Sequence, residues 1–350
     1  MDFGVSLGSN LKIGNIAEHS KVAEENGFSH LGFVDQPFHD RDAWVSMTIA
    51  AMNTSSILIG QTVTDPFTYH PLVIANATAT VNELSEGRAF VGIGAGGAGA
   101  KAIFKPVPLN ELRDAVVFIQ QVTSGMKGDF KGVWEPRTRT SEMHSVWIRD
   151  RIPVYWAADG LKSAEMAGEV ADGVIFSGGH PELTKMRLEH VEKGALKAGR
   201  DPSEIDIWLR SMIFLSDSKE EAMPEVASFA ATQANATYRF ALKNPEVGKL
   251  LEKIDPGIVD EFRKVSEAYA HYDHERPGAI HGNVVSKKVI DFFHLTGNLE
   301  DVCEGIYKVE QLRAQNGLKV KCLGLAMFTI KDQIGMMREI GSQVIPLFKT

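Results

Sequence analysis

The feature that most constrains the fold is an alternation between short apolar, β-branched runs and longer segments of helical period. Such alternation is typical of βαβ units, in which a parallel sheet is buried on both faces. About eight of these runs occur, which is the number that a closed barrel needs. The chain is therefore predicted to be an α/β protein, a (β/α)8 TIM barrel. Strands are expected over residues 3–7, 30–34, 57–63, 90–94, 154–158, 173–176, 207–215 and 322–327.

Amphipathic segments lie between these runs, and each is suited to cover the outside of the barrel. Several stop at a pair that ends in glycine, such as Asn26-Gly27 and Asn316-Gly317. Glycine favours the end of a helix because it adopts the left-handed backbone conformation without strain. Helices are predicted over residues 16–25, 71–84, 109–122, 163–170, 183–198 and 299–315.

Two connections are too long to be simple loops and are predicted to be insertions. Residues 125–152 contain Gly, Pro, Trp and several arginines, which indicates an excursion or hairpin over one end of the barrel. Residues 217–297 contain further helical segments at 225–242 and 256–271, and are expected to form a lid or substrate wall. A division into two domains within the first insertion is the alternative. The regular alternation on both sides of this insertion indicates instead that residues 1–350 form a single domain.

Charge and composition exclude several classes of function. The net charge of -8 comes from scattered acids and bases, without a basic run that would indicate nucleic-acid binding. The two cysteines, Cys303 and Cys322, are far apart and lack metal-ligand spacing, which fits a reducing cytoplasm. No signal-like or membrane-spanning run is apparent, so we expect a soluble, cytoplasmic protein.

Candidate site residues cluster where the predicted strands end, because TIM barrels carry their active sites at the C-terminal ends of the strands. Several clusters are rich in small residues, which let the backbone approach a flat ring or a phosphate closely. A planar, phosphorylated cofactor is therefore expected, although glycines also serve simply to shape loops. The clusters are Asp35 and Gln36; Thr62 and Val63; Gly94 and Ala95; Ala157, Ala158, Asp159 and Gly160; and Ser177, Gly178, Gly179 and His180.

Other patterns narrow the chemistry. The Gly92-x-Gly94-x-x-Gly97 spacing is that of a dinucleotide-binding fingerprint, but no acidic residue follows at a second strand end about twenty positions later. Neither a Gly-x-Ser-x-Gly elbow nor a P-loop occurs. His39, His70 and His180 are acid or base candidates, or are merely solvated, and none has metal-site spacing, so no metal is expected. Redox chemistry carried by a cofactor remains.

Five segments together resemble the luciferase-like superfamily, and within it the deazaflavin-dependent branch. That branch includes methylenetetrahydromethanopterin reductases and glucose-6-phosphate dehydrogenases that use coenzyme F420. The resemblance extends over nearly the whole chain and implies a TIM barrel with a deazaflavin in its mouth. The segments that carry it are residues 27–35, 60–71, 84–94, 152–158 and 164–175.

The resemblance also implies roles for individual residues. It places the ring-binding pattern on Asp35 and Gln36, on Thr62 and Val63, on Gly94 and Ala95, and on residues 157–160. Residues 177–180 resemble the family's phosphate loop, and a cis peptide bond between Thr62 and Val63 is implied. Homodimers are the family's usual assembly.

Two departures from the family pattern bear on catalysis. Gln36 stands where many deazaflavin enzymes carry a catalytic histidine, and Gly97 replaces a glutamate. Gln36 cannot titrate, but it can hydrogen-bond a carbonyl or hydroxyl group. The leading hypothesis is an F420-dependent oxidoreductase that transfers a hydride to or from a small organic substrate, with Asp35 and Gln36 as catalytic residues and Asp35 ionised. An FMN-dependent monooxygenase and a non-catalytic flavin-binding barrel are the alternatives, and Asp35 itself has a purely structural alternative.

Overall fold

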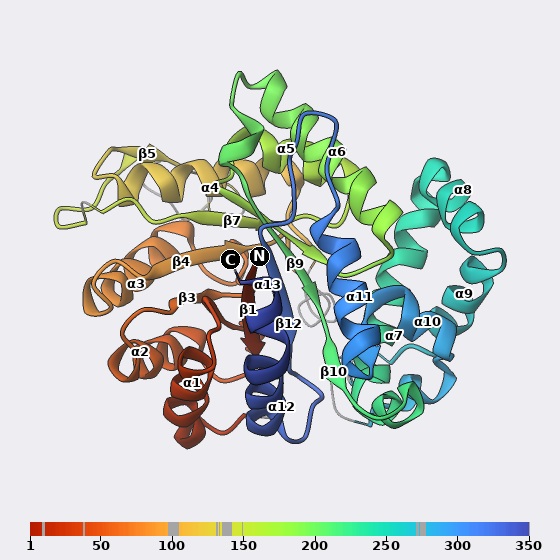
Figure 1. The fold of residues 1–350 in the computed structure, drawn as a ribbon. Helices are drawn as coiled ribbons and strands as arrows, with labels where there is room; N and C mark the ends of the chain where they lie inside the picture. The colour runs from red at the N-terminus through yellow and green to blue at the C-terminus, as the bar shows by residue number, and fades with distance from the viewer. Residues whose placement is uncertain are drawn as a thin grey trace.

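The computed structural model is a closed barrel of eight parallel strands with helices around it (Figure 1). It describes residues 1–8, 11–37, 39–96, 105–130, 132, 134, 142–148, 150–270, 273 and 278–349. The strands follow one another around the barrel in the order β1-β12-β9-β8-β7-β4-β3-β2. The barrel closes because β1 and β2, at the two ends of this order, also pair with each other. The strands are β1 (Asp2–Leu7), β2 (His30–Phe33), β3 (Leu58–Gln61), β4 (Ala89–Ile93), β7 (Val154–Ala157), β8 (Gly173–Ser177), β9 (Asp206–Ser211) and β12 (Cys322–Ala326). The predicted (β/α)8 barrel is confirmed.

The prediction of one continuous strand over residues 207–215 is wrong. The chain leaves the barrel after β9 and forms β10 (Ile213–Leu215), which pairs with β11 (Leu295–Gly297) outside it. Met212 marks the division, because its carbonyl accepts a hydrogen bond from the Leu295 amide at 3.0 Å. The apolar run continues through both strands, so hydrophobicity alone did not reveal the break.

The helices of the barrel largely match the predictions. The bounds of α1 (Ile16–Glu25) and α3 (Pro71–Leu84) agree with the predicted ranges. The last predicted helix is five residues too long, since α11 (Leu299–Glu310) is followed by a turn in which Gly317 has a φ of 94°. The remaining outer helices are α2 (Ala43–Asn53), α4 (Leu109–Thr123), α5 (Leu161–Val170), α6 (Pro181–Lys197), α12 (Gln333–Glu339) and α13 (Ile345–Phe348), with short helices at Ile13–Asn15, Pro202–Glu204 and Ile340–Val344.

Both predicted insertions are present. The first contains a hairpin of β5 (Gly128–Asp129) and β6 (Glu142–Met143). The second is mostly helical, and Figure 1 shows its helices gathered on one side of the barrel. They are α7 (Lys219–Lys243), α8 (Pro245–Ile254), α9 (Ile258–Ala268), a short helix at Ile280–Val284, and α10 (Lys287–Phe293). No helix in the described part of the chain is long and apolar enough to cross a membrane.

Large aromatic side chains fill the lower part of the barrel. Phe90, Tyr155 and Trp208 are buried in one cluster, and the Phe90 ring lies 5.2 Å from Tyr155 and 5.8 Å from Trp208. The neighbouring strands β12 and β1 carry Gly324 and Gly4, where a Cβ would run into the Trp208 indole. Aromatic side chains thus fill this part of the barrel, and the candidate ligand site is at the other end.

Gly324→Ala tests this packing. Its added methyl would overlap the Trp208 indole between two fixed strands. Overpacking of this kind costs about 1–3 kcal/mol, so we expect a lower melting temperature. Gly14→Ala is the matched control because no atom lies within 4 Å of its added methyl. Equal melting temperatures for the two variants would show that the indole can move aside.

Candidate active site

Predicted ring-binding residues from three strands meet at the C-terminal mouth of the barrel. A Cβ added to Gly94 would lie 3.2 Å from Val63 Cγ2 and 3.6 Å from Ala157 Cβ, so these positions form one wall. The peptide bond between Thr62 and Val63 is cis, as the family resemblance implied. Because Gly94 has no side chain, Val63 and Ala157 pack closely around it, and we expect a flat ring to lie against the surface that they form.

Asp35 lies two residues after the end of β2 and near Thr64, the residue that follows Val63. It is 5% exposed, and its Oδ2 atom has no hydrogen-bond partner among the described residues. Burial raises the pKa of Asp35 to about 7, the charges of Asp65 and Asp42 act in the same direction, and the nearby Thr64 hydroxyl opposes them. The expectation that Asp35 is fully ionised at neutral pH is therefore wrong, because it assumed an ordinary, solvated carboxylate. Asp35 can both hold and release a proton near pH 7.

The neighbouring Gln36 is only half-buried. Its carbonyl accepts hydrogen bonds from the amides of His39 and Asp40, each at 2.8 Å, which fixes the turn that follows. Its side-chain amide makes no hydrogen bond with the part of the chain that the structure describes. Gln36 is thus held by its backbone, and its side chain is available to a substrate.

The fifth and sixth strand ends are joined by a hydrogen-bonded cluster around the buried Arg187. Asp159 accepts hydrogen bonds from the Ser177 amide and hydroxyl, both at 2.7 Å. Arg187 lies beneath them and donates to the carbonyls of Asp159 and Ser177 at 3.1 and 2.9 Å. Asp159 and Ser177 thus bond to each other and shape the loop, and their contribution to cofactor binding stays a prediction.

Ala158 and Gly160 also have local roles. The Ala158 amide donates to the Ile175 carbonyl at 3.0 Å and extends the pairing of β7 with β8. A Cβ on Gly160 would lie 3.5 Å from the Phe240 ring, so α7 covers this part of the mouth. The Ala95 carbonyl accepts from the Val107 amide at 2.8 Å. The fourth-strand residue Gly97 lies outside the described residues.

The start of α6 offers amides for an anion. The Gly178 amide is already bonded to the Arg210 carbonyl at 2.5 Å, but the amides of Gly179 and His180 have no partner among the described residues. Pro181 occupies the first helical position, and His180 Nδ1 accepts from the Glu182 amide at 3.3 Å. Free amides at a helix N-terminus attract anions, which fits a phosphate at Gly179 and His180.

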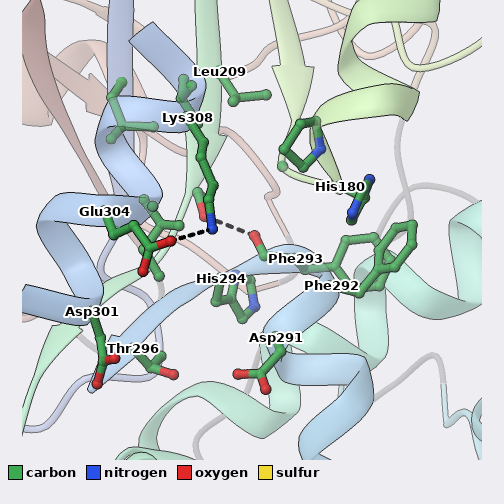
Figure 2. A pocket seen from close by; sticks show the side chains of 18 of the residues that line it. His180, Leu209, Asp291, Phe292, Phe293, His294, Thr296, Asp301, Glu304 and Lys308 are labelled. Atoms are coloured by element: carbon green, nitrogen blue, oxygen red, sulfur yellow. Dashed lines mark hydrogen bonds and ion pairs between the residues drawn. The ribbon is translucent and has the colours of Figure 1, made fainter. Parts of the chain in front are cut away.

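A cavity of about 290 Å³ opens beside this loop (Figure 2). Two buried polar atoms in its lining, His294 Nε2 and Thr296 Oγ1, lack partners in the described part of the chain. Burial lowers the pKa of His294 to about 3, so its imidazole is neutral. Lys308, labelled in Figure 2, is paired with Glu304 at 2.8 Å. The cavity therefore combines these two neutral polar groups with charged side chains, among which Lys219 also pairs with Asp291 at 2.9 Å.

Arg210, near the end of β9, is a site residue that the sequence prediction missed. Its guanidinium Nη1 donates to the Thr62 carbonyl at 3.1 Å, and its own carbonyl accepts from Gly178. Arg210 thereby connects the predicted ring wall with the predicted phosphate loop. The available signal was a charged residue at the end of an otherwise apolar strand run.

A second candidate histidine, His70, has a structural role. His70 caps α3, with its Nδ1 accepting from the Leu72 amide at 3.0 Å, and its ring meets Phe118, Phe130 and Trp134 edge-on. Burial lowers the pKa of His70. His39 lies in the turn after Gln36, and neither histidine contributes to the wall around Gly94.

The fold is that of a TIM-barrel protein, and its candidate ligand site is at the C-terminal ends of the strands. Residues 1–316 match the family described as luciferase-like monooxygenase, and the chain belongs to that family. The resemblance read from the sequence is confirmed.

Individual relatives point to one branch of the family. The chain is 29% identical over 305 residues to a 5,10-methylenetetrahydromethanopterin reductase of Methanolobus tindarius, with 86% of this chain and 88% of that protein covered. It is 28% identical over 265 residues to an F420-dependent glucose-6-phosphate dehydrogenase of Nakamurella multipartita, with 68% and 75% covered. The structure of the coenzyme F420 dependent tetrahydromethanopterin reductase from Methanopyrus kandleri aligns over 99% of both chains with a TM-score of 0.80 at 24% identity, which supports the fold.

Asp35→Asn tests the environment of Asp35 through stability. A carboxyl whose pKa is raised from 3.8 to about 7 by folding loses stability as pH rises from about 4 to about 7, because ionisation is then favoured only in the unfolded state. The variant lacks this cost, which is of the order of 4 kcal/mol at most. We expect the melting temperature of Asp35→Asn minus that of the wild type to increase across this range and then level off.

Asp217→Asn, at an exposed position, controls for the loss of a carboxylate. A difference between Asp35→Asn and the wild type that stays constant from pH 4 to 8 would contradict the raised pKa.

Proposed function

We propose that the protein is an F420-dependent oxidoreductase that transfers a hydride between the deazaflavin and a small organic substrate. The observation that carries this proposal is a small-residue wall at Val63, Gly94 and Ala157 in the same barrel mouth as two free amides at Gly179 and His180. A planar ring with a phosphate needs both features. The relatives named above support the choice of cofactor.

The residues present fit such a cofactor. The unpartnered Oδ2 of Asp35 and the closely packed wall at Gly94 would face the ring. The amides of Gly179 and His180 would hold the phosphate at the start of α6. When bound, the deazaflavin supplies the hydride chemistry, and the protein supplies binding and orientation.

The protein's own groups account for the remaining steps. Asp35, with a pKa near neutrality, holds or accepts the proton that accompanies oxidation or reduction of the substrate. The side-chain amide of Gln36 donates a hydrogen bond to the reacting substrate oxygen, in place of a titrating histidine. Helix α7 approaches the mouth near Gly160 through Phe240 and would help to keep water out of it.

Cofactor titration tests the proposal. The purified protein is titrated with oxidised F420, FMN and FAD while ligand fluorescence is followed. We expect saturable binding of F420 at concentrations at which FMN and FAD do not bind. Preferential FMN binding would support the monooxygenase alternative instead, and binding of none of the three would support a non-catalytic barrel or one that has lost its cofactor.

The variant Gly179→Asp tests, by the same titration, where the phosphate of the cofactor binds. A Cβ at Gly179 meets no atom closer than 3.5 Å, so the fold should tolerate the change. The added carboxylate would repel the phosphate, and we expect F420 binding to weaken at least about tenfold, or ~1.4 kcal/mol. Gly14→Asp controls for the added charge at a remote, open position. Unchanged affinity in Gly179→Asp would show that the phosphate lies elsewhere.

We also propose that the enzyme is a cytoplasmic homodimer and that residues 1–350 form one domain. Both described insertions are attached to the barrel: β10 and β11 pair beside it, and the hairpin of β5 and β6 follows α4. Cys303 and Cys322 are both unpaired, which suits a reducing compartment.

A further inference from the structure

The side chain of Arg210 crosses the inside of the barrel. Trp208, two residues earlier on β9, points into the barrel interior, so strand alternation places Arg210 on the same inner side, closer to the mouth. Its Nη1 reaches the Thr62 carbonyl at 3.1 Å. Thr62 follows β3, which lies four strands from β9 in either direction around the barrel. The guanidinium therefore lies across the floor of the mouth.

Aromatic rings hold this guanidinium in place. Arg210 Cζ lies 5.6 Å from the ring centres of both Phe229 and Phe328. Phe229 belongs to α7, and its ring also stacks on His294 at 5.5 Å. A guanidinium fixed between aromatic rings is pre-organised, because it loses little further freedom when a ligand arrives.

Among the residues that the structure describes, no acidic side chain neutralises the positive charge of Arg210. No carboxylate of the described residues lies within 4.0 Å of it, and its Nε is buried without a hydrogen-bond partner in that part of the chain. Arg187, the other arginine near the site, differs because it lies 3.7 Å from Asp159. Holding an unpaired cation in a partly desolvated position is costly unless a ligand supplies the opposite charge.

The proposed reaction creates such a charge. A hydride carries one proton and two electrons: the C–H bond of the substrate breaks, and a C–H bond forms on the ring. The substrate would be oxidised, its proton would pass to a base, and the ring would be reduced with one added negative charge. We propose that Arg210 is the counter-charge that stabilises the reduced deazaflavin in its anionic form. This inference rests on the proposed function.

The test compares affinities for the two redox states of F420. Oxidised F420 is titrated by fluorescence, and reduced F420 is titrated anaerobically by calorimetry, for the wild type, Arg210→Lys and Arg210→Met. We expect Arg210→Met to lose affinity for the reduced form at least tenfold more than for the oxidised form. The midpoint potential of bound F420 then falls by about 30 mV for each tenfold loss. Arg210→Lys, which keeps the charge, should retain most of the difference.

Lys193→Met is the matched control, because it removes an exposed positive charge on α6 far from the mouth. Melting temperatures check folding, and Arg210→Gln, which keeps a donor for Thr62, replaces Arg210→Met if that variant is unstable. If the wild type binds F420 in neither state, the proposed function fails and the inference fails with it. If the wild type binds both states but Arg210→Met weakens both equally, the proposed function stands and Arg210 is not the counter-charge.

Discussion

The structure depends on how the barrel closes around its aromatic filling. Trp208, Phe90 and Tyr155 occupy the interior, and strands can approach them only where glycine replaces a side chain, as at Gly4 and Gly324. This packing makes the lower barrel solid. It also supports Arg210, which lies two residues after Trp208 on β9 and therefore closer to the mouth. The position of the candidate ligand site thus follows from the position of the core.

Above this core, the site combines strand ends that are far apart in sequence. Asp35 and the wall at Gly94 form one side, and the loop before α6 forms the other. Arg210 joins the two sides through Thr62 and Gly178. A ring and its phosphate would thus be held by groups whose spacing is set by the barrel rather than by flexible loops.

Much of the fold could be predicted because its local signals agree with it. The helix over residues 71–84 begins with Pro71 and ends near Gly87, and both ends are where the sequence places them. Helix α2, by contrast, is apolar on most of its faces and lacks a clear helical period. The strand break at Met212 depends on pairing with Leu295, more than 80 residues later, and no local pattern contains that information.

The site was predictable to the extent that strand ends meet in a barrel mouth. The properties of its residues were not, because they depend on the surroundings. Asp35 has a pKa near 7 only because the fold buries it near two other acids. Ser177 and Asp159 form hydrogen bonds with each other. Arg210 reaches Thr62 because its side chain points into the barrel from β9.

A crystal structure of the protein with oxidised F420 is the most direct test of this account. The account predicts that the ring lies against Val63 and Gly94, above the guanidinium of Arg210, with the phosphate on the amides of Gly179 and His180. Density for the ring in the cavity beside His294, outside the barrel wall, or at any place away from the mouth would contradict it.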